Sequence, residues 1–286
     1  MLKKRIVGLL RLFRFELPFT AGVCVVLGEL LALGKSPSAV EIALGFLGVF
    51  FISATSLILN DYFDYETDRI NAPQRPLPAG LVTKADVVAL SIFVTLLGFT
   101  AGYLISPEAL TVIVLVWATG FLYNWRFKKA GLFGNLLVSF SVSMTFIFGG
   151  IVVDRPLEKV VWSFAIMVFL SNLGEEIAAD AMDVEGDRQA GSRSLAVRFG
   201  SEHALRISRA IFLLMIISSC LPFIVGWLKW VYLFPILFMD MTVLYATGKL
   251  LDAKTVNRRK YIRWIYLSGL VALLIFIIIR VVIINT

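Results

Sequence analysis

The stretch GVFFISATSLILNDYFDYETDR (residues 48–69) joins an apolar run to a dense group of carboxylates. Asp61, Asp64 and Asp68 follow one another at spacings of three and four, which would place them on one face of a helix. Like charges at these spacings repel, and a carboxylate at the centre of a bilayer costs about 3 kcal/mol even on a lenient scale. We therefore expect these aspartates at a helix end or in a wet cavity, facing positive charge.

The composition around this stretch indicates an integral membrane protein. Hydrophobic residues make up 59% of the chain, charged residues only 16%, and the mean hydropathy is +0.86. Soluble domains carry about 25% charged residues. Cys24 and Cys220 both fall inside apolar runs, which is typical of small core residues and not of a disulfide or a metal pair.

Nine segments are long and apolar enough to cross a bilayer, for which a helix needs about 20 residues. They are residues 17–34, 40–60, 86–105, 107–124, 132–153, 159–179, 204–227, 230–250 and 263–284. The pattern predicts an all-α, polytopic membrane protein with a bundle of about nine transmembrane helices. No remaining stretch is long enough to form a separate soluble domain.

Lysine and arginine are distributed unevenly between the two sides that these spans define. With nine spans, 22 of the 27 basic residues fall in the N-terminal segment and in the loops after the second, fourth, sixth and eighth spans. Loops rich in Lys and Arg stay in the cytoplasm. We expect a multi-pass protein of the cell membrane whose N-terminus, and the aspartates after the second span, face the cytoplasm.

The acidic group has a second copy in ADAMDVEGDR (residues 179–188), at the end of the sixth span. The shared pattern D-x-x-D-x-x-x-D-R consists of Asp61, Asp64, Asp68 and Arg69 in the first copy and Asp180, Asp183, Asp187 and Arg188 in the second. A further arginine follows each copy, Arg75 and Arg193. We interpret the chain as one membrane domain with two motif-bearing halves, roughly 1–131 and 132–286, whose motifs meet in one cytoplasmic cavity.

Carboxylate oxygens without His or Cys suit a hard divalent cation, and Mg²⁺ usually bridges protein carboxylates to substrate phosphates. The candidate catalytic and metal-binding residues are Asn60, Asp61, Asp64, Asp68, Asp180, Asp183 and Asp187. The alternative is a solvated loop whose charges only end a helix. Two copies of one pattern on the same side favour a functional site over that alternative.

Basic residues on the same side complete a possible diphosphate clamp. They are Arg69, Arg75, Lys128, Lys129, Arg188 and Arg193. Any one of them is equally well explained as an ordinary positive-inside residue. Residues 71–80 are too rich in proline for a helix and form a loop that could cover a cavity.

The two motifs, NDYFDYETDRINAPQRPLPAG (60–80) and DAMDVEGDRQAGSRSLAVRFG (180–200), resemble those of the UbiA superfamily of intramembrane prenyltransferases. The resemblance implies a helical bundle around a central cavity that opens laterally to lipid, with Mg²⁺ holding a prenyl diphosphate. It also implies that Tyr123 and Lys128, in YNWRFKK, reach the diphosphate, and that Arg14 lies near the acceptor.

Within that superfamily, GNLLVS (134–139), FIFGG (146–150) and NLGEEI (172–177) are most similar to the archaeal digeranylgeranylglyceryl phosphate synthases. That branch implies a polyprenyl diphosphate donor, a lipophilic acceptor, geranylgeranylglyceryl phosphate, and a role in ether-lipid synthesis. Here Glu175 and Ala179 stand where the branch has Arg and Lys. An aromatic quinone precursor or a chlorophyll-type acceptor therefore remains an alternative.

Two rival classes fit less well. A CDP-alcohol phosphotransferase needs D-x-x-D-G, but Tyr65 follows Asp64 and Val184 follows Asp183. A cation transporter would carry ionisable residues near the middle of its spans. The acidic residues near mid-span are few here, Glu29 and Asp240.

Overall fold

The structure of the protein, a computed structural model, describes residues 2–252 and 254–285, and that part of the chain contains helices but no strand. The helices are α1 (Leu2–Leu12), α2 (Glu16–Leu33), α3 (Ala39–Phe63), α4 (Tyr65–Asn71), α5 (Lys84–Ile105), α6 (Pro107–Leu122), the π-helical turn η1 (Tyr123–Phe127), α7 (Leu132–Val152), α8 (Lys159–Met182), α9 (Val184–Gln189), α10 (Leu195–Phe199), α11 (Ser201–Ile224), the 3₁₀ turn η2 (Trp230–Tyr232), α12 (Leu233–Leu251) and α13 (Arg259–Asn285).

The predicted spans are confirmed. Within the described residues, nine helices are long and apolar enough to cross a membrane, and the chain is a multi-pass membrane protein. The largest differences from the predicted bounds concern the ninth, sixth and seventh spans. α13 begins at Arg259, four residues before the predicted start at 263. α8 continues to Met182, three residues further than expected, and α11 lies at Ser201–Ile224 where 204–227 was predicted. The fourth span continues past Leu122 into η1, whose wider turn ends at Phe127.

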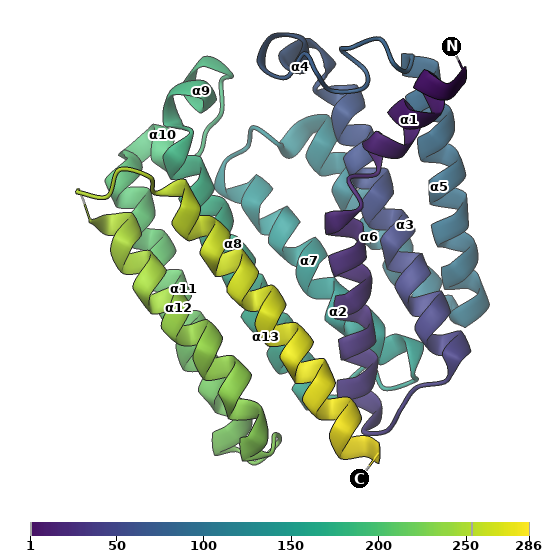
Figure 1. Cartoon of the computed structure of the whole chain (residues 1–286), viewed down its shortest axis with the longest axis vertical. Coiled ribbons are helices and arrows are strands. Elements are labelled where there is room, and N and C mark those ends of the chain that lie inside the picture. Colours follow the sequence, from purple (N-terminus) through teal and green to yellow (C-terminus); the bar gives the residue numbers. More distant parts are fainter. Residues whose placement is uncertain (1, 253, 286) are drawn as a thin grey trace. The chain divides into compact units, whose positions relative to one another are not determined.

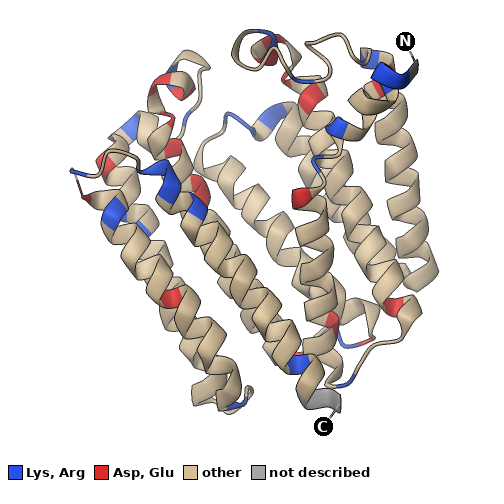
Figure 2. Ribbon diagram, viewed as in Figure 1, with Lys and Arg blue, Asp and Glu red and all other residues tan. Residues whose placement is uncertain are grey.

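The chain divides into two compact units. The first unit consists of Met1–Val26 and Ser38–Trp125, and the second of Leu27–Pro37 and Arg126–Thr286. The boundary runs through α2 and η1, and each unit contains one copy of the aspartate motif. In each unit the charged residues gather mostly at the end that carries the short helix of its motif, α4 in the first and α9 in the second (Figure 2).

In the first unit, α3 packs against α5 and α6, and α1 packs against α3 and α5 (Figure 1). The core includes Leu12 of α1, Ile58 of α3 and Val94 of α5, all essentially inaccessible. Capping boxes define where α3 and α5 begin: Ser38 exchanges hydrogen bonds with Glu41, and Thr83 does so with Asp86. These packed helices form the support from which the first motif extends.

In the second unit, α8 packs against α7, α11 and α13, and α12 packs against α11 and α13 (Figure 1). The core includes Ile177 of α8, Phe212 and Met215 of α11 and Val243 of α12. Gly174 lets α11 approach α8, because a Cβ there would meet the Phe212 ring at 2.9 Å. The second motif extends from the end of this packed α8.

Candidate active site

Both motifs interrupt their helix at the middle aspartate. α3 ends at Phe63 and α4 begins at Tyr65, with Asp64 between them at φ −86° and ψ 2°. α8 ends at Met182 and α9 begins at Val184, with Asp183 between them at φ −117° and ψ 17°. The prediction that three aspartates share one continuous helical face is therefore wrong. Spacings of three and four are compatible with a helix, but the middle residue leaves the helical conformation.

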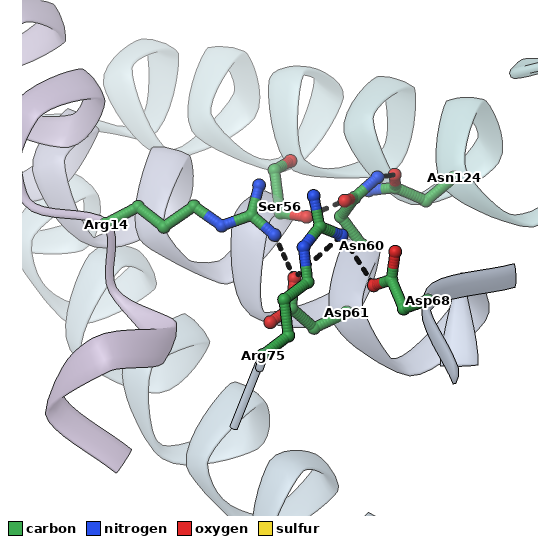
Figure 3. Close-up of polar contacts among 7 residues, drawn as sticks. All are labelled: Arg14, Ser56, Asn60, Asp61, Asp68, Arg75 and Asn124. Atoms are coloured by element: carbon green, nitrogen blue, oxygen red, sulfur yellow. Dashed lines mark hydrogen bonds and ion pairs between the residues drawn. The ribbon is translucent and has the colours of Figure 1, made fainter. Parts of the chain in front are cut away.

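The first motif pairs its buried carboxylates with two arginines from distant parts of the chain (Figure 3). Asp61 and Asp68 are only 1% and 5% exposed. Arg14 donates to Asp61, and Arg75 donates to Asp68 at 2.5 Å while lying 3.8 Å from Asp61. A buried charge is tolerated when it is paired and hydrogen-bonded. The positive charge that the sequence required at these aspartates is supplied by protein side chains.

Local backbone geometry brings both arginines to the motif. Arg14 lies between α1 and α2 with φ 44°, a left-handed conformation that is uncommon outside glycine. Arg75 lies in the proline-rich loop after α4, where its N–H bonds the Ala72 carbonyl at 3.0 Å. α1 is tied at its other end as well, because Arg5 donates to Asp86 of α5.

Asn60, the residue before Asp61, belongs to a chain of amides (Figure 3). Its Nδ2 donates to Asn124 Oδ1 at 3.0 Å, and Asn124 Nδ2 donates to the Ser56 carbonyl at 2.9 Å. Asn124 lies in η1, directly after the half-buried Tyr123. Within the first unit, the structure therefore forms two polar networks from adjacent residues: Asp61 and Asp68 pair with Arg14 and Arg75, and Asn60 pairs with Asn124.

The second motif has different partners. Asp180 accepts a hydrogen bond from Asn135 Nδ2 of α7 at 2.9 Å. Asp183 accepts from Arg259 at the start of α13, and both side chains are exposed, at 52% and 66%. Burial raises the pKa of the Asp187 carboxyl, the charge of Asp183 raises it further, and hydrogen bonds from Ser194 and Ser192 act in the opposite direction.

Apart from Arg75, the predicted basic residues fall into two groups. Arg69 and Arg188 are exposed and lie near glutamates of their own short helices, 3.4 Å from Glu66 and 4.0 Å from Glu185 respectively. Lys128 and Arg193 are also exposed, and their loops touch each other within the second unit. The Arg193 N–H donates to the Lys129 carbonyl at 3.0 Å.

Gly131, with φ 64°, makes this loop contact possible, because a Cβ there would overlap the Arg193 carbonyl. The structure thus joins the basic segment after the fourth span to the loop that follows the second motif. The side chains of Lys128 and Arg193 both remain exposed.

A polar stripe continues from the second motif into the membrane span of α8. Asn172 accepts a hydrogen bond from Ser139 of α7 at 3.1 Å, and Ser171 bonds Glu175 at 3.4 Å. Glu175 and its neighbour Glu176 both keep partial accessibility. The region next to Asp180 is therefore acidic and amide-rich in this chain.

The donor set fits a hard divalent cation. Among the residues that the structure describes, no three carboxylate, histidine or cysteine side chains converge on a point where they could hold a metal ion. Mg²⁺ is nevertheless usually bound through one or two carboxylates, with water and substrate phosphate completing the shell. The oxygen donors of Asn60, Asp64 and Asp68, and those of the second motif, are of the type that Mg²⁺ prefers.

Three residues of these networks were not predicted from the sequence: Asn124, Asn135 and Arg259. Two of them carried a weak signal, because an amide inside an apolar segment is expensive unless it is hydrogen-bonded. Asn124 lies next to Tyr123, and Asn135 lies within GNLLVS. Arg259 carried no signal beyond the general excess of basic residues in its loop.

A polytopic helical fold with aspartate-rich motifs at the ends of the second and sixth spans is typical of a class of intramembrane enzymes. The model of the UbiA prenyltransferase family matches residues 21–270. The chain belongs to this family and is a prenyltransferase. It is 34% identical to the digeranylgeranylglyceryl phosphate synthase of Thermococcus gammatolerans, over 83% of this chain and 86% of the relative. It is 35% identical to that of Methanopyrus kandleri, over 74% and 77%.

Solved structures show the same fold. A structure from work on digeranylgeranylglyceryl phosphate synthase in membranes is 29% identical, with a TM-score of 0.81 and coverage of 97% of this chain and 99% of that one. A UbiA homologue from Archaeoglobus fulgidus, bound to GPP and Mg²⁺, is 18% identical with a TM-score of 0.72, and the coverage is 98% and 100%. The predicted fold class and family are confirmed.

Proposed function

We propose that this chain catalyses the Mg²⁺-dependent transfer of a prenyl group from a polyprenyl diphosphate to a lipophilic acceptor, and that geranylgeranylglyceryl phosphate is the favoured acceptor. The observation that carries the donor assignment is the pair of aspartate motifs, each broken at its middle residue and each accompanied by arginine. The relatives that are 34–35% identical and named digeranylgeranylglyceryl phosphate synthase support the acceptor.

The residues of each motif have separable tasks in this reaction. Asp64, Asp68, Asp183 and Asp187, with Asn60, would hold Mg²⁺, which neutralises charge on the departing diphosphate. The guanidinium groups of Arg14 and Arg75 lie at the buried carboxylates. This supports a role for Arg75 in pairing with diphosphate oxygens and for Arg14 near the acceptor.

Bond changes at the prenyl carbon follow from this arrangement. The C1–O bond of the allylic diphosphate breaks with carbocation character, the acceptor hydroxyl attacks C1, and its proton is released. Fixed charges aimed at the leaving group lower the barrier for this step. Water must be kept away because it would capture the cation, and the membrane-embedded, apolar spans favour its exclusion.

One observation favours a second acceptor class. A phosphate-bearing acceptor needs cations, yet α8 offers Glu175 and Glu176 beside Asp180. Arg14, Arg188 or Arg193 would then have to bind the acceptor phosphate. An aromatic ring with a hydroxyl group would instead donate hydrogen bonds to this acidic stripe.

Product analysis separates the two acceptors. Purified protein is supplied with geranylgeranyl diphosphate, Mg²⁺ and either geranylgeranylglyceryl phosphate or a hydroxybenzoate, and products are identified by mass spectrometry. We expect the doubly prenylated glyceryl phosphate. Prenylation of the aromatic acceptor alone would make the ether-lipid assignment wrong and leave prenyl transfer intact.

The orientation in the membrane is part of the same proposal. Single cysteines at Ala72 and Gln189, in a background lacking Cys24 and Cys220, should react with an impermeant thiol reagent only from the cytoplasmic side. Ala72 directly follows α4, and Gln189 is the last residue of α9. Labelling of the two positions from opposite sides would contradict a shared cytoplasmic site.

A further inference from the structure

Asn124 is a buried amide to which none of the steps above gives a task. It is 8% exposed and lies in η1, where the fourth span changes from an α-helical to a π-helical turn. π-Helical turns are rare and occur frequently at functional sites. Asn124 also contacts Asn60, the amide that opens the first motif, through a hydrogen bond of 3.0 Å (Figure 3).

The Ser56 carbonyl fixes the direction of both hydrogen bonds in the series from Asn60 through Asn124 to Ser56. The Ser56 group is a backbone carbonyl, which can only accept, so Asn124 must turn its NH₂ group toward it, at 2.9 Å. The Oδ1 of Asn124 then faces Asn60 and can only accept in turn. Asn60 must therefore donate to Asn124 through its own NH₂ group. The side-chain oxygen of Asn60 does not bond Asn124.

Close packing of two helices holds Asn124 in place. Gly120, four residues earlier on α6, lies so near α3 that a Cβ would overlap Ser56 Oγ. The same approach brings Asn124 within reach of the Ser56 carbonyl one turn further along. The next residue, Trp125, is exposed, so η1 separates one inward amide from an outward aromatic side chain.

We infer that Asn124 is a positioning residue for prenyl transfer, which fixes the rotation of the Asn60 amide so that its oxygen, and not its NH₂ group, is presented to the cation and diphosphate beside Asp61. The inference rests on the proposed Mg²⁺-dependent function. Without Asn124, the amide could rotate by half a turn and present a donor to a cation, which reverses the sign of the interaction. Partners that orient metal ligands in this way typically contribute about 10- to 100-fold to metal affinity.

The test measures Mn²⁺ binding by electron paramagnetic resonance, with purified protein and geranylgeranyl thiolodiphosphate as an unreactive donor. Asn124→Leu should weaken Mn²⁺ binding about tenfold or more. Asn124→Asp should retain the affinity, because its buried carboxyl group in the protonated form donates to the Ser56 carbonyl and still accepts from the Asn60 NH₂ group. An equal loss in both variants would overturn the inference, as would wild-type affinity in folded Asn124→Leu.

A matched control separates positioning from simple packing. Thr95→Val removes another buried hydrogen bond between helices of the first unit, the 3.2 Å bond from Thr95 to Thr55. This variant should melt at a lower temperature and bind Mn²⁺ as the wild type does. A similar loss of Mn²⁺ affinity in Thr95→Val would mean that Asn124 acts only through stability.

A double-mutant cycle completes the test. In an Asn60→Asp background, both terminal atoms of the side chain are oxygens, so either rotation presents an oxygen to the cation. Adding Asn124→Leu there should change Mn²⁺ affinity less than about twofold, in contrast to the roughly tenfold effect expected in the wild-type background. A tenfold loss in both backgrounds would overturn the inference. If the wild type itself bound no Mn²⁺ with the diphosphate, the proposed function would be wrong, which distinguishes the two failures.

Discussion

Asp61, near the end of α3, and Asp68, in α4, are buried and paired with guanidinium groups, whereas Asp183, after α8, is exposed and pairs with an exposed arginine. The two motifs share their spacing and the break at the middle aspartate. Their surroundings differ because the partners come from elements outside the repeat: a left-handed turn and a proline-rich loop for the first motif, and the start of α13 for the second. The repeated sequence therefore supplies the same carboxylates twice, but the electrostatic environment of the two motifs differs.

The largest expected effect is on prenyl transfer, and it should be the same for a substitution in either motif. Asp64→Ala and Asp183→Ala should each abolish prenyl transfer, because both break points present a carboxylate to the proposed cation, while each protein still inserts and folds. Transfer is measured with a labelled prenyl diphosphate, and excess EDTA should abolish wild-type transfer as well. Full activity in either variant, or undiminished activity in EDTA, would contradict a shared metal site.

The free energy of unfolding should respond differently to loss of the arginine partner in the two motifs. Removing one partner of a buried ion pair costs about 3–5 kcal/mol, and the partial exposure of Arg75 lowers our expectation for Arg75→Ala to roughly 2–3 kcal/mol. Arg259→Ala, which breaks an exposed pair, should cost less than about 1 kcal/mol. Thermal melting of the two purified variants without added metal compares them. Equal melting temperatures would show that burial does not distinguish the motifs.

The amide partner of the second motif should give an intermediate effect. Asn135→Leu deprives Asp180 of its 2.9 Å hydrogen bond, and loss of such a bond to a charged group costs roughly 1.5–3 kcal/mol. The melting temperature of this variant should fall between those of Arg75→Ala and Arg259→Ala. A protein as stable as the wild type would place Asp180 in a fully solvated environment.

Effects on acceptor use are expected from the basic residues proposed to bind the acceptor phosphate. Arg14→Ala, Arg188→Ala and Arg193→Ala are compared with geranylgeranylglyceryl phosphate as acceptor. One charge-assisted contact to the acceptor phosphate contributes roughly 1.5–3 kcal/mol, so the variant that lacks it should raise the acceptor KM about tenfold or more. Unchanged acceptor KM in all three would favour the aromatic acceptor, which needs no cation.

The bundle could be predicted because hydropathy alone determines which segments cross a membrane, and the nine spans needed only adjustments at their ends within the described residues. The two aspartate motifs could be recognised because their spacing is repeated in the sequence, and their role as metal ligands stays a prediction. The helix breaks could not, since spacings of three and four suit a continuous helix equally well. Arg14 was expected near the acceptor from family resemblance, but its bond to Asp61 depends on one left-handed residue that local sequence does not specify.

The hydrogen-bond partners of Asn124 and Asn135 could not be predicted from the sequence. An isolated asparagine in an apolar segment indicates that some hydrogen-bond partner exists, but not which one. The partner of Asn124 depends on the π-helical turn and on the close approach at Gly120, both of which arise from packing between α3 and α6. Asn135 reaches Asp180 because α7 and α8 pack side by side.

The turn at Arg14 has a practical consequence for handling this protein. The residue lies 47 positions before its partner Asp61 in the chain, in a segment that is easily mistaken for a dispensable leader. Trimming the chain to the start of the first span, or limited proteolysis between α1 and α2, would remove a cation from a buried carboxylate. Affinity tags are therefore better placed away from the N-terminal segment, in which Arg5 binds Asp86 and Arg14 binds Asp61.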